Sequence, residues 1–208
     1  MVFYPIADTL VMKAKLLFLG VLLLGCESPR LPRPKAYPRL TLPDTGRYDT
    51  LDCPICPMRF AYPAYAKLHY VPKDSCWFDI YFPDLDAYWH ITAHDLHTLH
   101  KTPGKALETY RKLIYKHAIR ATDIMERSIR GPHGKGFFYE IYGDAPTHAL
   151  LFYTDSVRYA LMIASYFKVA GAEDSLAPVI DRMKYELQRI YPTITWRPVE
   201  LTRTRTCF

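Results

Sequence analysis

Five cysteines in 208 residues are the first side chains whose spacing could carry chemistry. Cys53-Pro54-Ile55-Cys56 has the spacing of a redox dithiol or of half a zinc site. A thioredoxin-like dithiol needs a βαβ context, whereas the residues around this motif are rich in proline and strand-like. The chain has no second Cys-x-x-Cys that would complete four thiolates around zinc. We therefore expect these cysteines to be structural and to form disulfides.

A histidine cluster is the second candidate site, and its members are His90, His94, His97 and His100. A short helix over residues 93–100 would place His94 and His97 on one face, where two imidazoles could hold a metal ion. The other interpretation is a polar surface helix that tolerates histidine. The zinc protease motif HExxH, which supplies a glutamate general base, is absent from the sequence. We predict no bound metal, and a ligand- or metal-binding lipoprotein that uses residues 90–100 is the alternative function.

Asp155 is the carboxylate that stands out, because it lies between two predicted strands. Catalysis at Asp155 would require a second carboxylate or a histidine placed by the fold, and an Asp-Ser pair is already explained by turn formation. His117 lies on the apolar side of a predicted helix, which favours a histidine of the core. No glycine-rich phosphate loop, serine elbow or kinase motif is present in the sequence. The prediction is a protein that is not an enzyme and uses no cofactor.

A segment near the start of the sequence predicts where the protein resides. Lys13 and Lys15 precede an apolar run of about ten residues that ends in Leu-Leu-Gly-Cys, which is the pattern of a bacterial lipoprotein signal. A run this short cannot cross a bilayer, which requires about 20 apolar residues. We predict cleavage after Gly25 and lipidation of Cys26, whose acyl chains would anchor the mature chain to a membrane.

The remaining chain divides by composition. Removal of the signal peptide, residues 1–25, leaves 183 residues and lowers the net charge from +6 to +5. Residues 26–45 mix prolines with charges and predict an extended tether, residues 46–200 predict one domain, and residues 201–208 predict a tail. Lysines and arginines are scattered through the domain, which argues against nucleic-acid binding. Met12 is a second candidate start of the chain.

Alternating patterns predict strands in the first half of the domain. Segments 40–42, 59–62 and 66–71 are short and next to prolines, which is typical of edge strands. In segment 76–82, Phe78, Ile80 and Phe82 alternate with more polar positions. We predict that segment 76–82 is a central strand and that residues 87–91 form its hairpin partner.

Helical patterns and tight turns dominate the second half. An apolar stripe at three- and four-residue steps predicts one long helix from Pro103 to its C-cap at Gly131. Three antiparallel strands follow at 136–142, 149–154 and 157–168, and a terminal helix covers 175–190. The predicted fold class is α+β, a mostly antiparallel sheet with a long central helix and a C-terminal helix packed on it.

Several segments in order resemble the gliding motility lipoprotein GldD family. They are residues 56–63 with 65–66, 76–83, 116–124, 154–156 with 166–167, and 174–179. Their order and spacing extend over roughly residues 37–197. The resemblance implies a membrane-attached accessory of the gliding machinery that is tied to type IX protein secretion and has other proteins of that machinery as partners.

The resemblance also implies that Cys56 and Cys76 are a disulfide pair, a cross-link worth roughly 3 kcal/mol on loop-entropy grounds. Cys53 and Cys207 are a second candidate pair. With a lipid anchor and oxidised cysteines, the domain is expected to face the periplasm, on the inner or the outer membrane. The 17 tyrosines are an aromatic content typical of surfaces on which another protein docks.

Overall fold

A computed structural model describes residues 41–44, 46–70, 76–117, 119–167 and 173–198. The predicted signal peptide, the lipidation site Cys26, most of the predicted tether, Cys207 and the predicted tail lie outside the described residues.

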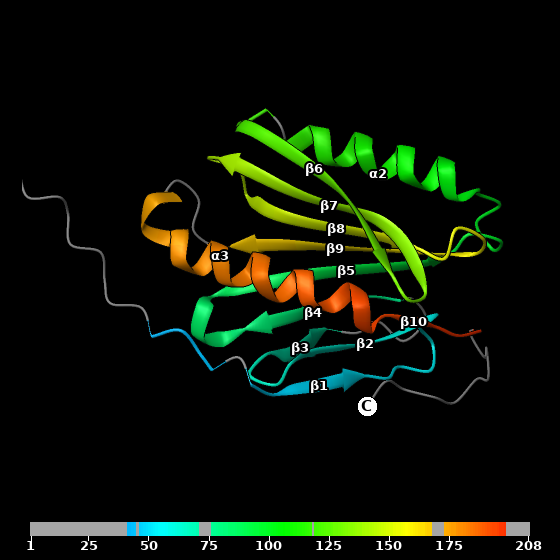
Figure 1. The fold of residues 1–208 in the computed structure, drawn as a ribbon, viewed down its shortest axis with the longest axis horizontal. Helices are drawn as coiled ribbons and strands as arrows, with labels where there is room; N and C mark the ends of the chain where they lie inside the picture. The colour runs from blue at the N-terminus through cyan, green and yellow to red at the C-terminus, as the bar shows by residue number, and fades with distance from the viewer. Residues whose placement is uncertain (1–40, 45, 71–75, 118, 168–172, 199–208) are drawn as a thin grey trace, which may run out of the picture. The chain divides into compact units, whose positions relative to one another are not determined.

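A seven-stranded antiparallel sheet organises the domain (Figure 1). Its order is β3-β4-β5-β9-β8-β7-β6, so that neighbours in space come from both halves of the sequence. The strands, in chain order, are β3 (Lys67–Tyr70), β4 (Trp77–Phe82), β5 (Ala87–Asp95), β6 (Ala121–Gly131), β7 (Gly134–Gly143), β8 (Thr147–Thr154) and β9 (Tyr159–Phe167). The fold class is α+β, as predicted.

A smaller sheet has the order β1-β2-β10 and lies against the same core as one face of the large sheet. Its strands are β1 (Tyr48–Leu51), β2 (Met58–Pro63) and β10 (Thr195–Trp196). Two 3-10 helices, η1 (Pro83–Leu85) and η2 (Tyr191–Thr193), follow β4 and precede β10. Strand β10 therefore brings the end of the described chain beside the start of β2.

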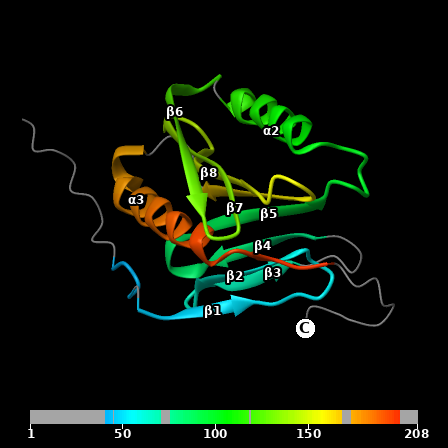
Figure 2. The same cartoon turned by 45° about the vertical axis from the view of Figure 1, so that its right-hand side comes forward.

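Helices α2 (Pro103–His117) and α3 (Glu173–Ile190) cover opposite faces of the large sheet (Figure 2). Strand β8 shows why, because it is buried on both faces. Leu151 and Tyr153 join the core beneath α3, whereas Leu150 and Phe152 join the core beneath α2. Since strand side chains alternate between faces, one strand serves both cores.

A buried carboxylate ties α3 to the small sheet. Glu186 is fully buried, and its carboxylate accepts hydrogen bonds from the hydroxyls of Tyr48 at 2.7 Å and Tyr65 at 3.3 Å. The guanidinium of Arg182, one turn earlier, lies 3.6 Å away. Burial and the neighbouring carboxylate raise the pKa of Tyr48 to about 12 and that of Tyr65 further. Both phenols therefore stay protonated and donate to Glu186.

The predicted helix over residues 103–131 is wrong in its second half. Helix α2 ends at His117, and residues 121–131 form the edge strand β6, which pairs with β7 from Ala121 to Gly131. Ile129 is the one buried residue of β6, so the strand lacks the two-residue alternation that reveals a half-buried strand. Hydrogen bonding to β7 decides the conformation, because strand preference depends on the neighbours.

The predicted short helix over residues 93–100 is also wrong. Strand β5 continues to Asp95, which pairs with Tyr159 of β9, and residues 96–100 form turns. Residues 41–42 have no regular structure, although a strand was predicted over 40–42. Strand β4 lies between β3 and β5, near one edge, so it is not central; its hairpin with β5 is as predicted.

Candidate functional site

The most distinctive exposed surface is one face of the large sheet over β3, β4, β5 and β9. In β4, Phe78, Ile80 and Phe82 point into the core, and the alternate side chains point to the other face. Cross-strand pairing continues that face onto β5 and β9. We call this surface the open face and define it by His69, Trp77, Asp79, Tyr81, Tyr88, His90, Thr92 and Tyr166.

Aromatic rings contact one another across the open face. Tyr81 and Tyr88 stack with centroids 4.6 Å apart, and His69 meets the two rings edge-on at 6.1 and 5.6 Å. His90 lies 4.6 Å from the Tyr166 ring, and its Nδ1 contacts the carboxylate of Asp79. Such ring pairs contribute about 0.5–1.5 kcal/mol each. The side chains are therefore held in place before any partner arrives, which lowers the entropy lost on binding.

The open face is partly accessible, because His69, Trp77 and His90 are exposed and its other members are half-buried. Helix α2 lies on the same side of the sheet, but it packs over β8 and β9. It reaches β5 only near the end of that strand, where Tyr110 of α2 stacks on His94. Trp77 is 51% exposed, and the His90 side chain is 46% exposed. A contiguous exposed patch of large side chains often marks a site of contact with another protein. These residues are the strongest candidates for contact with another molecule.

The predicted histidine pair does not share a helix face. His94 lies in β5 and His97 in the turns after it, where its backbone N–H donates to Asp95. Burial, together with the charge of Lys101, lowers the pKa of His94. Within the described ranges, no three residues of the types His, Cys, Asp and Glu are grouped as metal ligands would be. The absence of a bound metal stays a prediction.

The Asp155 side chain forms hydrogen bonds within the turn that contains it. One carboxylate oxygen accepts backbone N–H groups of Val157, Arg158 and Tyr159, each at 2.9 Å, in the connection from β8 to β9. This is the turn role that the sequence predicted for an Asp-Ser pair. The side chain of His117 lies outside the described residues.

The Cys-x-x-Cys motif forms a buried turn between β1 and β2. Cys53 and Cys56 are 2% and 0% exposed, and the Cys56 N–H donates to the Cys53 carbonyl at 3.0 Å. The guanidinium of Arg197 donates to both of those cysteine carbonyls and to Asp52. Burial of both thiol positions argues against a reactive dithiol, which requires access.

The structure brings Cys56 next to Cys76. Their Cα atoms are 5.0 Å apart and their sulfur atoms lie at bonding distance. The link would join the entry of β2 in the small sheet to the entry of β4 in the large sheet. Cys207, the predicted partner of Cys53, lies outside the described residues.

The open face was not among the sites predicted from the sequence. The signal was present in segment 76–82, where the positions opposite Phe78, Ile80 and Phe82 include Trp77 and Tyr81. A solvent-facing strand side usually carries small polar or charged residues. The contribution of β5 and β9 could not be found in this way, because it depends on strand pairing.

The chain matches the model of a known protein family. The family model described as gliding motility lipoprotein GldD matches residues 27–196, which is most of the chain. No curated protein matches the chain. Among the described residues, no helix combines the length and apolar character needed to cross a membrane.

Proposed function

Because this chain belongs to the gliding motility lipoprotein GldD family, we propose that it is a lipid-anchored accessory of the gliding machinery linked to type IX protein secretion. In this proposal the protein is a non-catalytic structural or assembly component. Cys26 carries the lipid, residues 26–45 act as a tether, and the domain faces the periplasm.

We further propose that the open face docks another protein of that machinery. The observation that carries this proposal is the contiguous aromatic surface over β4 and β5, with Trp77 half exposed and Tyr81 stacked on Tyr88. Tyrosine and tryptophan are enriched at protein interfaces because they offer a large apolar area with a polar end. Their prior ordering by ring contacts favours a specific partner over non-specific adhesion.

The alternative function, a metal-binding lipoprotein built on residues 90–100, has no comparable support. His90 and His94 lie on one strand, and His97 lies in the turns that follow. In the described residues, the hydrogen bonds of the Asp155 carboxylate go to backbone N–H groups of its own turn, which does not favour a role in catalysis. An Asp155→Asn variant keeps an oxygen that can accept the three N–H groups, so we expect it to retain function.

A matched pair of substitutions tests the docking surface. Trp77→Glu places a charge on the open face, and Met125→Glu places the same charge on β6, where the exposed fraction is almost equal at 51% and 50%. In cells that lack the native gene, we expect Trp77→Glu to abolish spreading and secretion and Met125→Glu to retain both. His69→Glu is a second variant on the open face.

The urea unfolding midpoint of each variant checks that it is folded, and membrane fractionation checks that it is anchored. Full spreading and secretion with folded, anchored Trp77→Glu and His69→Glu would contradict the docking proposal. Loss of function in folded Asp155→Asn would contradict the non-catalytic role.

A further inference from the structure

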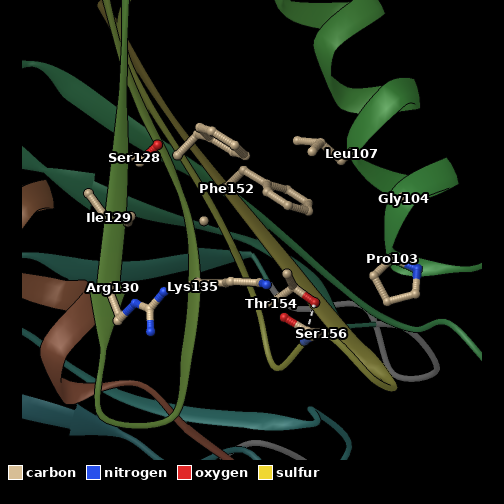
Figure 3. A pocket seen from close by; sticks show the side chains of 12 residues that line it. Pro103, Gly104, Leu107, Ser128, Ile129, Arg130, Lys135, Phe152, Thr154 and Ser156 are labelled. Atoms are coloured by element: carbon tan, nitrogen blue, oxygen red, sulfur yellow. Dashed lines mark hydrogen bonds between the residues drawn. The ribbon is translucent and has the colours of Figure 1, made fainter.

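A cleft of about 570 Å³ lies between the first turns of α2 and the strands β6, β7 and β8 (Figure 3). It lies on the side of the sheet that α2 covers, beside the start of that helix. Pro103 and Leu107 of α2 form one wall. The volume is in the range of sites for small molecules, which is about 300–1,000 Å³.

The floor of the cleft is apolar. Phe137 of β7 and Phe152 of β8 lie opposite Leu107, as Figure 3 shows for Phe152. Phe152 is 2% exposed and is fixed by contact with Tyr110, at 5.3 Å between ring centroids. Phe137 is held from outside by the guanidinium of Arg111, 5.0 Å from its ring. A rigid apolar floor favours an apolar chain over water.

Two cations border this floor. Arg130 of β6 and Lys135 of β7 are directly opposite each other in the antiparallel register, and both line the cleft. Neither forms an ion pair with another residue of the described ranges. Like charges directly opposite in a sheet repel and destabilise the pair. An anion between them would remove that repulsion and accept charge-assisted hydrogen bonds.

We propose that this cleft binds a single-chain amphiphile with an anionic head group, such as a fatty acid. The chain lies on Phe137 and Phe152, and the head group is held by Arg130 and Lys135. The hydroxyls of Ser128 and Ser156 line the same cleft and supply neutral donors. This inference does not depend on the proposed docking function of the open face.

Gly104 offers a way to block the cleft. It lines the cleft in the first turn of α2, and a Cβ added there would meet no atom within 4 Å. Gly104→Trp should therefore fill the cleft without a backbone clash. Gly104→Ala adds one methyl group and leaves most of the cleft open, which makes it the matched control.

The test uses the mature chain, residues 26–208, with Cys26→Ser so that it carries no lipid of its own. Decanoate, decyl phosphate and 1-decanol are titrated below their critical micelle concentrations, and heat is measured. We expect both anions to bind at least tenfold more tightly than decanol. Arg130→Gln with Lys135→Gln should weaken decanoate at least tenfold, and Gly104→Trp should abolish binding.

A charge-matched control removes Lys67 and Lys116, two exposed lysines away from the cleft, by substitution with glutamine. We expect it to bind decanoate as tightly as the parent. The proposal is overturned if decanoate does not bind the parent chain, if decanol binds as tightly as decanoate, or if folded Gly104→Trp still binds. Binding of an acidic apolar peptide without binding of decanoate would also overturn it.

Discussion

Removal of the Cys56–Cys76 link should cost the domain a defined amount of stability. The two cysteines are 20 positions apart in sequence. Closing a loop of that length lowers the entropy of the unfolded chain by an amount worth about 3 kcal/mol at 25 °C. We therefore expect Cys56→Ala with Cys76→Ala to lower the free energy of unfolding by about 3 kcal/mol, beyond any loss from packing of the two sulfur atoms.

The assay is urea unfolding of the parent and the double variant, each with and without reductant. Reductant breaks every disulfide, so the difference between the reduced proteins reports only the loss of side-chain packing. The difference between the oxidised proteins reports packing and the cross-link together. Subtracting the first difference from the second isolates the cross-link.

Two results would contradict the predicted loss of stability. The first is an equal difference between parent and variant in oxidising and reducing conditions, which would mean that the bond contributes nothing. The second is a peptide map of the unreduced mature protein in which Cys56 and Cys76 are both free thiols. A map that joins Cys53 to Cys76 would show that a different pair is used.

Three further predictions concern single residues. Burial and Lys101 lower the pKa of His94, so as the pH falls the unfolded chain binds a proton at this residue before the folded chain does. The free energy of unfolding should therefore fall as the pH drops below about 6.5, by at most about 1.4 kcal/mol per pH unit, and the fall should be smaller in His94→Gln. Glu186→Leu leaves buried donors without an acceptor and should lower the free energy of unfolding by about 3–5 kcal/mol in urea, against about 1–2 kcal/mol for Tyr48→Phe. Equally small losses for the two variants would contradict the buried network. Cys26→Ala should release the chain from membranes or leave it unprocessed, and normal processing with full membrane retention would exclude lipidation at that residue.

Local patterns predicted much of this fold because several elements carry their own signals. Alternation of Phe78, Ile80 and Phe82 predicted β4, and the tight turns of the second half predicted the meander β7-β8-β9. Gly143 has a φ of 98°, a conformation that glycine adopts without strain. The apolar spacing of residues 175–190 predicted α3, which begins at Glu173.

Strand β6 could not be predicted in this way. Its residues are mostly exposed, and its apolar positions happen to continue the helical spacing of α2. Nothing in residues 121–131 indicates that β7 will supply their hydrogen bonds, because that pairing is set by the hairpin at Gly131 and Gly134. The cleft depends on the same pairing. Arg130 and Lys135 come together only when β6 is a strand, so a predicted helix over 103–131 conceals the cleft entirely.

Site-specific photocrosslinking in intact gliding cells tests directly whether the open face contacts a partner protein. A photoreactive amino acid is placed at Trp77 or His90 on the open face, and at Met125 or Val157 as exposed controls elsewhere on the domain. All four variants must first restore spreading. We expect one discrete crosslinked protein from Trp77 and His90 and none from Met125 and Val157. Equal crosslinking from all four positions, or crosslinking from the two controls alone, would contradict this expectation.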